Sequence, residues 1–336
     1  MSRAPGKTVL IAALALAGFA GPAVAAGPEL PIHTASDTGS YHTKLCPPLA
    51  QHIKDNQQFL SPACTPSAGS AENYDLVQQT PGTLGLAQFD VIANLLAAEP
   101  EGATPPVSIV ERTGVRECLF AVSNAEDPLT FKDIREAAAV AAFHLPPEGS
   151  GSAATFAFMQ SLHPDDLGAA FSVTHEADTM EMLRAVARAD QTVVGLFVQF
   201  PDLSSKAFEY INKAGLQVIG VGSRAMSTAR VADQRVYTVQ EVATSEGGWF
   251  SSAETARTMC TEVVIIAANP EAVSDVGAGK RLDLMTKALG GFDMVETATA
   301  DDRDWLARML DSAKEVTGPA AEGFLTEVEE ATGGML

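Results

Sequence analysis

The sequence predicts an α/β protein built as two lobes. Three observations support this prediction. Short apolar runs alternate along the chain with helical patterns, as in right-handed βαβ units. Residues 193–198 (VVGLFV) form a continuous apolar run, typical of a parallel strand that is buried on both faces. The length of 336 residues exceeds one average domain, so two hydrophobic cores are expected.

The first lobe begins with a strand at residues 31–34, a turn at 37–41 and a helix through Leu45, Leu49 and Ile53. A second turn, at residues 67–73, opens another helix. A strand at 83–87 then ends in Gln88-Phe89-Asp90-Val91. Twice, therefore, a strand delivers small residues to the start of a helix. Unpaired N–H groups and the positive end of the helix dipole can bind an anion there, so this stretch is predicted to form half of a ligand cleft.

The second lobe is predicted to span residues 119–222. Thr130 is a plausible N-cap for its first helix. The turn at residues 146–152 opens its second helix, which is rich in Phe and Met. The expected strands are 138–143, 171–174, 193–198 and 216–221, and the expected helices are 131–137, 153–162, 179–189 and 203–214.

The remaining chain has too few strand signals to form a lobe of its own. It offers one strand, at 260–267, and three helices, at 282–289, 301–313 and 320–331. We therefore expect residues 223–336 to complete the lobe begun by residues 27–118. The chain then crosses between the lobes near Cys118 and again near Gly222. The run from 107 to 122 is either two strands or one long crossing strand.

Charge and targeting signals indicate which partners are disfavoured and in which compartment the protein works. A formal net charge of −20 repels phosphate backbones and anionic lipids, which argues against nucleic-acid and membrane-surface partners. Residues 1–25 read as a signal peptide: Arg3 and Lys7 precede an apolar stretch, and Ala23-Val24-Ala25 is a cleavage site. We expect cleavage near Ala25 and export to the periplasm, with the protein a monomer.

Four cysteines in an exported protein allow disulfides. Cys46 and Cys64 are close in sequence, whereas Cys118 and Cys260 each begin an apolar run. Three pairings are possible, and Cys46–Cys64 with Cys118–Cys260 is favoured over the others. Four buried thiols are the alternative.

Four short motifs resemble, in order, those of the TAXI solute receptors of TRAP transporters. Gly39-Ser40-Tyr41, with Leu45 and Leu49-Ala50 following, is similar to the start of that family's first helix. Residues 67–73 (SAGSAEN) resemble its Gly-Ser-x-Glu-Asn turn, residues 86–91 (LAQFDV) its Gln-x-Asp-Val strand end, and residues 148–152 (EGSGS) its Gly-Ser-Gly turn. The match covers most of the chain after residue 25 and weakens after about residue 225.

The resemblance implies a type 2 periplasmic binding protein fold: two lobes, each a mainly parallel sheet flanked by helices, with two crossing strands as hinge. It implies a small carboxylate or amino-acid ligand and delivery to the membrane subunits of a TRAP transporter. Two departures affect the first wall of the cleft. Asp37-Thr38 and Cys46-Pro47 stand where the family has small residues, and Pro47-Pro48 should kink or break the first helix.

The predicted ligand-binding residues lie at helix starts and strand ends, because open α/β sheets bind ligands there. Ordinary turn and cap roles are the alternative for each. Glu72 is expected to stabilise the dipole of its helix rather than to touch ligand, whereas Asp90 could orient an ammonium group. The predicted set is Thr38, Gly39, Ser40, Tyr41, Ser70, Ala71, Asn73, Gln88, Asp90, Gly149, Ser150, Gly151, Ser152, Gln199 and Phe200.

No motif for catalysis emerges. There is no His-Glu-x-x-His, and Gly149-Ser150-Gly151 does not fit the G-x-S-x-G nucleophile elbow. No motif requires a cofactor or a metal. The sequence therefore favours a binding protein over an enzyme. An exported enzyme or a sensory receptor on the same two-lobed fold is the alternative.

Overall fold

The computed structural model describes residues 29–231, 233–247, 253–298 and 300–327. The predicted signal peptide and its cleavage site lie outside these residues, as does the loop around Trp249. The strands are β1 (Glu29–His33), β2 (Ser61–Thr65), β3 (Leu84–Gln88), β4 (Val107–Ser123), β5 (Ala142–Leu145), β6 (Ser172–His175), β7 (Val193–Gln199), β8 (Gln217–Gly220), β9 (Arg230–Val231), β10 (Gln234–Arg235), β11 (Tyr237–Ser245), β12 (Glu254–Ala268) and β13 (Ala313–Glu315).

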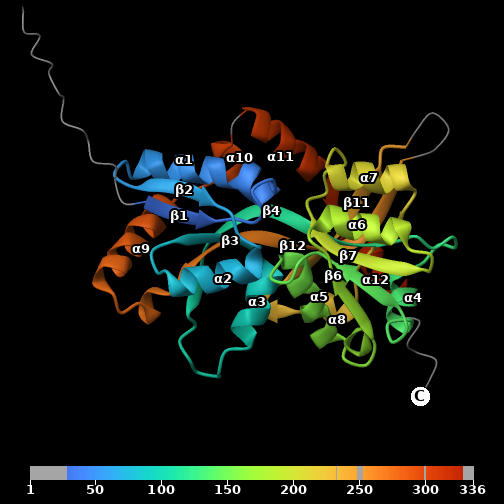
Figure 1. Ribbon diagram of the computed structural model, residues 1–336. Coiled ribbons are helices and arrows are strands. Elements are labelled where there is room, and N and C mark those ends of the chain that lie inside the picture. The colour runs from blue at the N-terminus through green and yellow to red at the C-terminus, as the bar shows by residue number, and fades with distance from the viewer. Residues whose placement is uncertain (1–28, 232, 248–252, 299, 328–336) are drawn as a thin grey trace, which may run out of the picture.

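The helices lie on both faces of the sheet (Figure 1). They are α1 (Cys46–Asn56), α2 (Ser70–Gln79), α3 (Phe89–Ala97), α4 (Phe131–Glu136), α5 (Gly151–Leu162), α6 (Thr179–Arg188), α7 (Lys206–Ala214), α8 (Arg224–Thr228), α9 (Val276–Ala288), α10 (Met294–Thr297), α11 (Ala300–Ser312) and α12 (Pro319–Glu327). A π-helical turn (Tyr41–Leu45) precedes α1, and short 3₁₀ turns lie at Leu167–Ala169 and Pro270–Ala272.

The same strand order occurs twice. In the first lobe the order is β2-β1-β3-β12-β4, and in the second it is β6-β5-β7-β4-β8. In each lobe one antiparallel strand, β12 or the second half of β4, lies among parallel ones. The fold is thus an α/β fold of two lobes joined by crossing strands, the arrangement of a type 2 periplasmic binding protein, as predicted.

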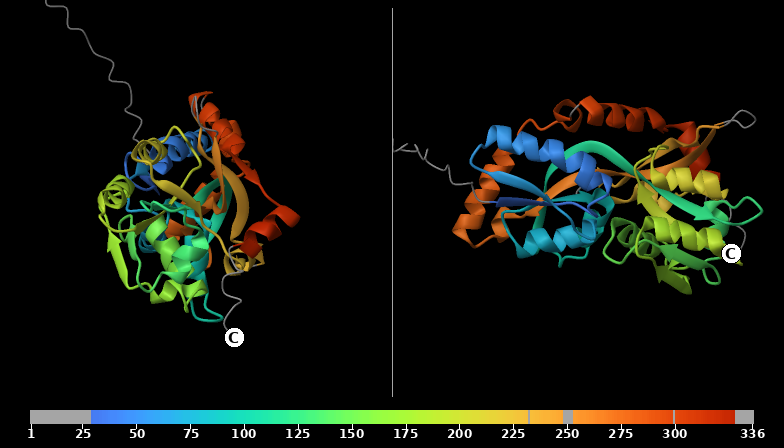
Figure 2. Two further views of the ribbon diagram at one scale, coloured as in Figure 1. Left: turned by 90° about the vertical axis from the view of Figure 1, so that its right-hand side faces the viewer. Right: turned by 45° about the horizontal axis from the view of Figure 1, so that its top comes forward.

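β4 and β12 are the crossing strands (Figure 2). β4 is one continuous strand of 17 residues, which settles the choice between one strand and two. Its first part pairs with β12 from Val107 to Cys118, and its last part pairs with β7 and β8. The β4–β12 register shifts between Glu262 and Val264, and Gly114 opposite has a φ of +71°. This irregular stretch of β4 is called the hinge below.

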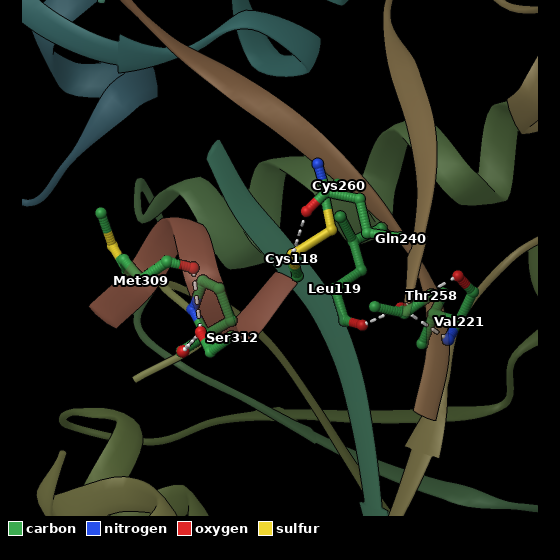
Figure 3. Close-up of a disulfide and its surroundings, with 9 residues drawn as sticks. Cys118, Leu119, Val221, Gln240, Thr258, Cys260, Met309 and Ser312 are labelled. Atoms are coloured by element: carbon green, nitrogen blue, oxygen red, sulfur yellow. Dashed lines mark hydrogen bonds between the residues drawn. A yellow bond between two sulfur atoms is a disulfide. The ribbon is translucent and has the colours of Figure 1, made fainter. Parts of the chain in front are cut away.

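Both disulfides have the pairing favoured from the sequence. Cys46 at the start of α1 is joined to Cys64 in β2, and Cys118 to Cys260. Cys118 and Cys260 are direct partners across β4 and β12, so this bond ties the crossing strands together just beyond the hinge (Figure 3). Two disulfides fit an oxidising compartment.

Local sequence explains most element boundaries. Ser150 caps α5 by accepting a hydrogen bond from the Ala153 N–H, and Thr130 forms a reciprocal capping box with Asp133. Gly195 in β7 allows α6 to pack closely, because a side-chain carbon there would lie 2.4 Å from Met182 Sδ.

The helical run does not break at Pro47-Pro48, but it changes from π-helical to α-helical just before them. The Cys46 N–H donates to the Tyr41 carbonyl across the π-helical turn, and both prolines lie in the first turn of α1. The π-helical turn continues directly into α1.

The strand expected at 138–143 begins later, as β5 at Ala142. Residues 137–141 form turns that leave Val140 85% exposed. Strands β2, β9, β10, β11 and β13 were not predicted.

The C-terminal part of the chain contacts both ends of the molecule. α9 and α10 pack against α1, whereas α12 reaches the opposite end. There Phe324 packs against Gly222, and Glu322 pairs with Arg224 at 3.3 Å. α11 lies along one side of the molecule, with Asp302 paired to Lys44 at 3.1 Å and Trp305 donating to Asp202 at 2.9 Å. Where the lobe boundary falls in this segment stays a prediction.

Candidate functional site

The N-terminal ends of α2 and α5 meet between the lobes. A side-chain carbon added at Gly69, just before α2, would lie 3.2 Å from the backbone nitrogen of Gly151, the first residue of α5. One added at Gly149 would lie 3.5 Å from the Ala68 side chain. Gly69 and Gly149 have φ angles of +133° and +81°, which other residues rarely adopt. The two predicted anion-binding turns thus contact each other directly. These turns, together with the side chains described next, are called the interlobe junction.

Gln88 fills the space in front of α5. A side-chain carbon at Gly151 would lie 1.9 Å from Gln88 Oε1, so only glycine fits in this arrangement. The Gln88 backbone N–H donates to Ser70 Oγ at 3.0 Å, which fixes the end of β3 to the first turn of α2. Gln88 is 3% exposed, and its Oε1 has no hydrogen-bond partner. A buried acceptor without a donor is costly, and a ligand N–H or O–H could satisfy it.

Glu117, on β4, is the first of two buried acids at the junction. The Tyr41 hydroxyl donates to Glu117 Oε2 at 2.6 Å. Burial raises the pKa of Glu117 to about 8; hydrogen bonds from Tyr41 and Gln88 limit this rise, and the charge of Asp90 adds to it. Burial and the neighbouring Glu117 likewise raise the pKa of Tyr41. Within the described residues, no lysine or arginine forms an ion pair with Glu117.

Asp90, the second buried acid, joins three elements. It is fully buried at the start of α3, and its Oδ2 accepts hydrogen bonds from Thr155 of α5 at 2.6 Å and from the Tyr237 hydroxyl of β11 at 2.7 Å. Burial raises the pKa of Asp90, although both hydrogen bonds oppose this rise. Asp90 Oδ1 has no partner. Asp90 therefore links the lobes and also leaves one acceptor free.

Asn73 braces the first sheet. Its amide nitrogen donates to the backbone carbonyls of His33 at 3.2 Å, Leu86 at 2.7 Å and Thr34, so it connects α2 to the ends of β1 and β3. Only its Oδ1 is left without a partner. A contact with ligand, if Asn73 makes one, would fall on that atom.

The remaining predicted residues of the second lobe lie around α5 and the end of β7. Ser152 Oγ accepts from the Val198 N–H at 2.9 Å, and the Gln199 amide donates to Ser205 within its own lobe at 2.7 Å. Phe200 is buried, with its ring centroid 6.0 Å from that of Tyr41. Phe200 thus places the end of β7 against Tyr41 of the first lobe.

The first turn lies at the edge of this arrangement. Thr38 is exposed, and its side chain forms no hydrogen bond with any described residue. The Gly39 carbonyl accepts from the N–H groups of His42 and Thr43. Ser40 and Ala71 are half-buried. The structure therefore brings together Tyr41, Ser70, Gln88, Asp90 and the 149–152 turn, and leaves Thr38 outside.

Three residues that contribute to the junction were not predicted: Glu117, Thr155 and Tyr237. Glu117 carried a signal, since it is a charged residue next to the apolar part of a crossing strand. Thr155 and Tyr237 carried none, because they acquire their role only through contact with Asp90.

The described residues offer little for catalysis. They contain no group of His, Cys, Asp and Glu side chains arranged to hold a metal ion. His163 Nε2 lies 2.7 Å from Ser223 Oγ, but both residues are buried, and Ser223 Oγ caps α8 by accepting from the Met226 N–H. Within the described chain, no helix is long and apolar enough to span a membrane.

No protein-family model matches the chain, and no curated protein matches it. Among solved structures, it is similar to MatC from Rhodopseudomonas palustris with bound malate, at 13% identity over 90% of this chain and 96% of that chain, with a TM-score of 0.46. It is also similar to an R. palustris protein with adipate, at 13% identity over 90% of this chain and 93% of that chain, with a TM-score of 0.43. A third is the periplasmic binding protein BugD, at 12% identity over 90% of this chain and 94% of that chain, with a TM-score of 0.44. At these identities and TM-scores, the likeness identifies neither a ligand nor a partner for this chain.

Proposed function

We propose that this chain is an extracytoplasmic solute-binding protein. It captures a small organic anion or amino acid at the interlobe junction and closes over it. The main evidence is that two helix N-termini meet at Gly69 and Gly151, that of α2 from one lobe and that of α5 from the other. Each supplies unpaired backbone N–H groups and the positive end of a helix dipole.

Hinge motion connects this geometry to binding. Two lobes joined by continuous strands can rotate about them, and a ligand that contacts both lobes favours the closed state. In the structure, Thr155 and Tyr237 already reach Asp90, and Gly151 already touches Gln88. We interpret this as the closed arrangement, with Gln88 Oε1 and Asp90 Oδ1 as acceptors available to a ligand.

The cellular role is part of the proposal. The four sequence motifs favour a TAXI-type receptor that works as a monomer in the periplasm and delivers its ligand to TRAP transporter subunits. The predicted signal peptide and the two disulfides support export. The division into residues 27–118 with 223–336 and residues 119–222 is proposed in the same way.

Thermal unfolding against a panel of amino acids, keto acids and dicarboxylates tests the proposal. A ligand present at about 100 times its Kd should add about 2.7 kcal/mol of stability and raise Tm. One chemical class should act, and Gln88→Ala should reduce its effect by at least half. Gln78→Ala, an exposed change on α2, is the matched control and should leave the effect intact. A panel that leaves Tm unchanged would overturn the proposal for these ligands.

A further inference from the structure

A cavity lies at the hinge, next to the interlobe junction along the chain, because its lining residues Arg116 and Pro201 adjoin Glu117 and Phe200. It has a volume of about 70 Å³ and is lined by Gly114 and Arg116 of β4, Gln240 of β11, Pro201 after β7, and Met309 and Leu310 of α11. Gln240 and Met309 are drawn near the Cys118–Cys260 disulfide in Figure 3. One water needs about 10–15 Å³ by this measure, so a molecule of a few non-hydrogen atoms fits. We call this the hinge cavity.

Arg116 is a cation without a hydrogen-bond or ion-pair partner in the part of the chain that the structure describes. Its direct neighbour across the strands is Glu262, and opposite charges at such positions usually pair. Here Glu262 accepts instead from Arg112 Nε at 2.8 Å and from the Gly114 N–H at 2.9 Å. Within the described residues, Arg116 forms no hydrogen bond or ion pair. Arg116 is half-buried, so its charge is open to solvent or to a ligand.

We propose that the hinge cavity binds a short aliphatic monocarboxylate. The guanidinium of Arg116 offers parallel N–H donors that match the two oxygens of a carboxylate. Pro201, Met309 and Leu310 form an apolar wall for the aliphatic end. The exposed Glu315 also lines the cavity, so its formal charge offsets that of Arg116, and a second negative charge on the ligand is disfavoured. This site does not depend on the proposed function of the interlobe junction.

The hinge cavity joins segments that hinge motion would move. Gly114 lies in the irregular stretch of β4, whereas Pro201 follows β7 and accepts a hydrogen bond from Ser312 at the end of α11. A ligand there contacts the hinge strand and α11 together. Its occupancy therefore restrains the hinge.

Propionate is the probe, and its uncharged analogue propionamide is the chemical control. Backbone amide shifts of the whole protein, followed by NMR during titration, should change saturably near Gly114, Gln240 and Leu310. Arg116→Gln should weaken propionate binding about 10-fold or more, and propionamide should bind about as poorly to the unaltered protein. Arg188→Gln removes the same charge from an exposed position on α6 and should leave the affinity unchanged.

Three results would overturn the proposal: equal affinity for propionate and propionamide, unaltered binding by Arg116→Gln, or shift changes confined to Ser70 and Gly151. The last result would assign the acid to the interlobe junction instead. Leu310→Glu is a second variant if Arg116→Gln folds poorly, because Leu310 is 49% exposed and tolerates substitution. It places another carboxylate at the cavity and should also weaken propionate binding.

Discussion

The interlobe junction and the hinge cavity differ in charge and in space. The junction holds two buried acids, Asp90 and Glu117, with no paired lysine or arginine among the described residues, and its glycine turns already touch. The hinge cavity holds an unpaired arginine and about 70 Å³ of space. The junction depends on contact between the lobes, whereas the hinge cavity is open within the same arrangement. If both proposals hold, recognition at the junction is coupled to closure, and recognition at the hinge cavity depends on Arg116 beside the exposed Glu315.

The Cys118–Cys260 disulfide lies beside the hinge and Cys46–Cys64 joins α1 to β2, and removing these bonds should have the largest effects on stability. Replacing Cys118 and Cys260 by alanine releases a loop of 142 residues, which should cost about 5 kcal/mol in the chain-entropy model. The same change at Cys46 and Cys64 releases 18 residues and should cost about 3 kcal/mol. Urea unfolding of both variants measures the difference. A larger loss from the Cys46–Cys64 pair would contradict this order.

The buried acids should give the junction a characteristic pH dependence. The folded pKa of Glu117, about 8, lies above its ordinary value of 4.5, so the folded state binds the extra proton. The free energy of unfolding should therefore fall as pH rises from about 4.5 to about 8, by up to a few kcal/mol, and level off above that range. Glu117→Gln should flatten this slope, and the exposed Glu209→Gln should not. Identical pH profiles for the unaltered protein and Glu117→Gln would show that the acid is not buried as described.

Adding one methyl group at the junction should lower the free energy of unfolding by a smaller amount. Gly151→Ala places a carbon 1.9 Å from Gln88 Oε1, so the lobes must separate or Gln88 must move, at a cost of about 1–3 kcal/mol. Gly279→Ala is the matched control: nothing lies within 4 Å of that helical position, and alanine should stabilise it by up to about 1 kcal/mol. Combining Gly151→Ala with Gln88→Ala should recover part of the loss. Equal effects at the two glycines would contradict direct contact between the lobes.

Most of the fold could be predicted because its strands and helices carry strong local patterns. β7 is apolar up to its last residue, Gln199, and Thr130 caps its helix as expected. β2 (SPACT) has no apolar alternation and is half-buried along its whole length, so its sequence carries little signal. The three residues of β13 are too few to show a period.

The candidate site was only partly predictable. Helix starts and strand ends can be read from sequence, which is why Ser70, Gln88 and the 149–152 turn were predicted. The burial of Glu117 depends on contact between the lobes, and no local pattern encodes that contact. The unpaired state of Arg116 depends on Glu262 pairing with Arg112 across a register shift, which only the structure reveals.

The distance between the lobes tests the central claim most directly. Nitroxide labels at Asp75→Cys on α2 and Ala157→Cys on α5, both exposed positions, would report this distance by pulsed electron paramagnetic resonance. We predict a broad distribution for the protein alone. Adding the panel of amino acids and carboxylates should shift it to a single short distance. One narrow distribution that is identical with and without the panel would contradict closure of the lobes around a ligand.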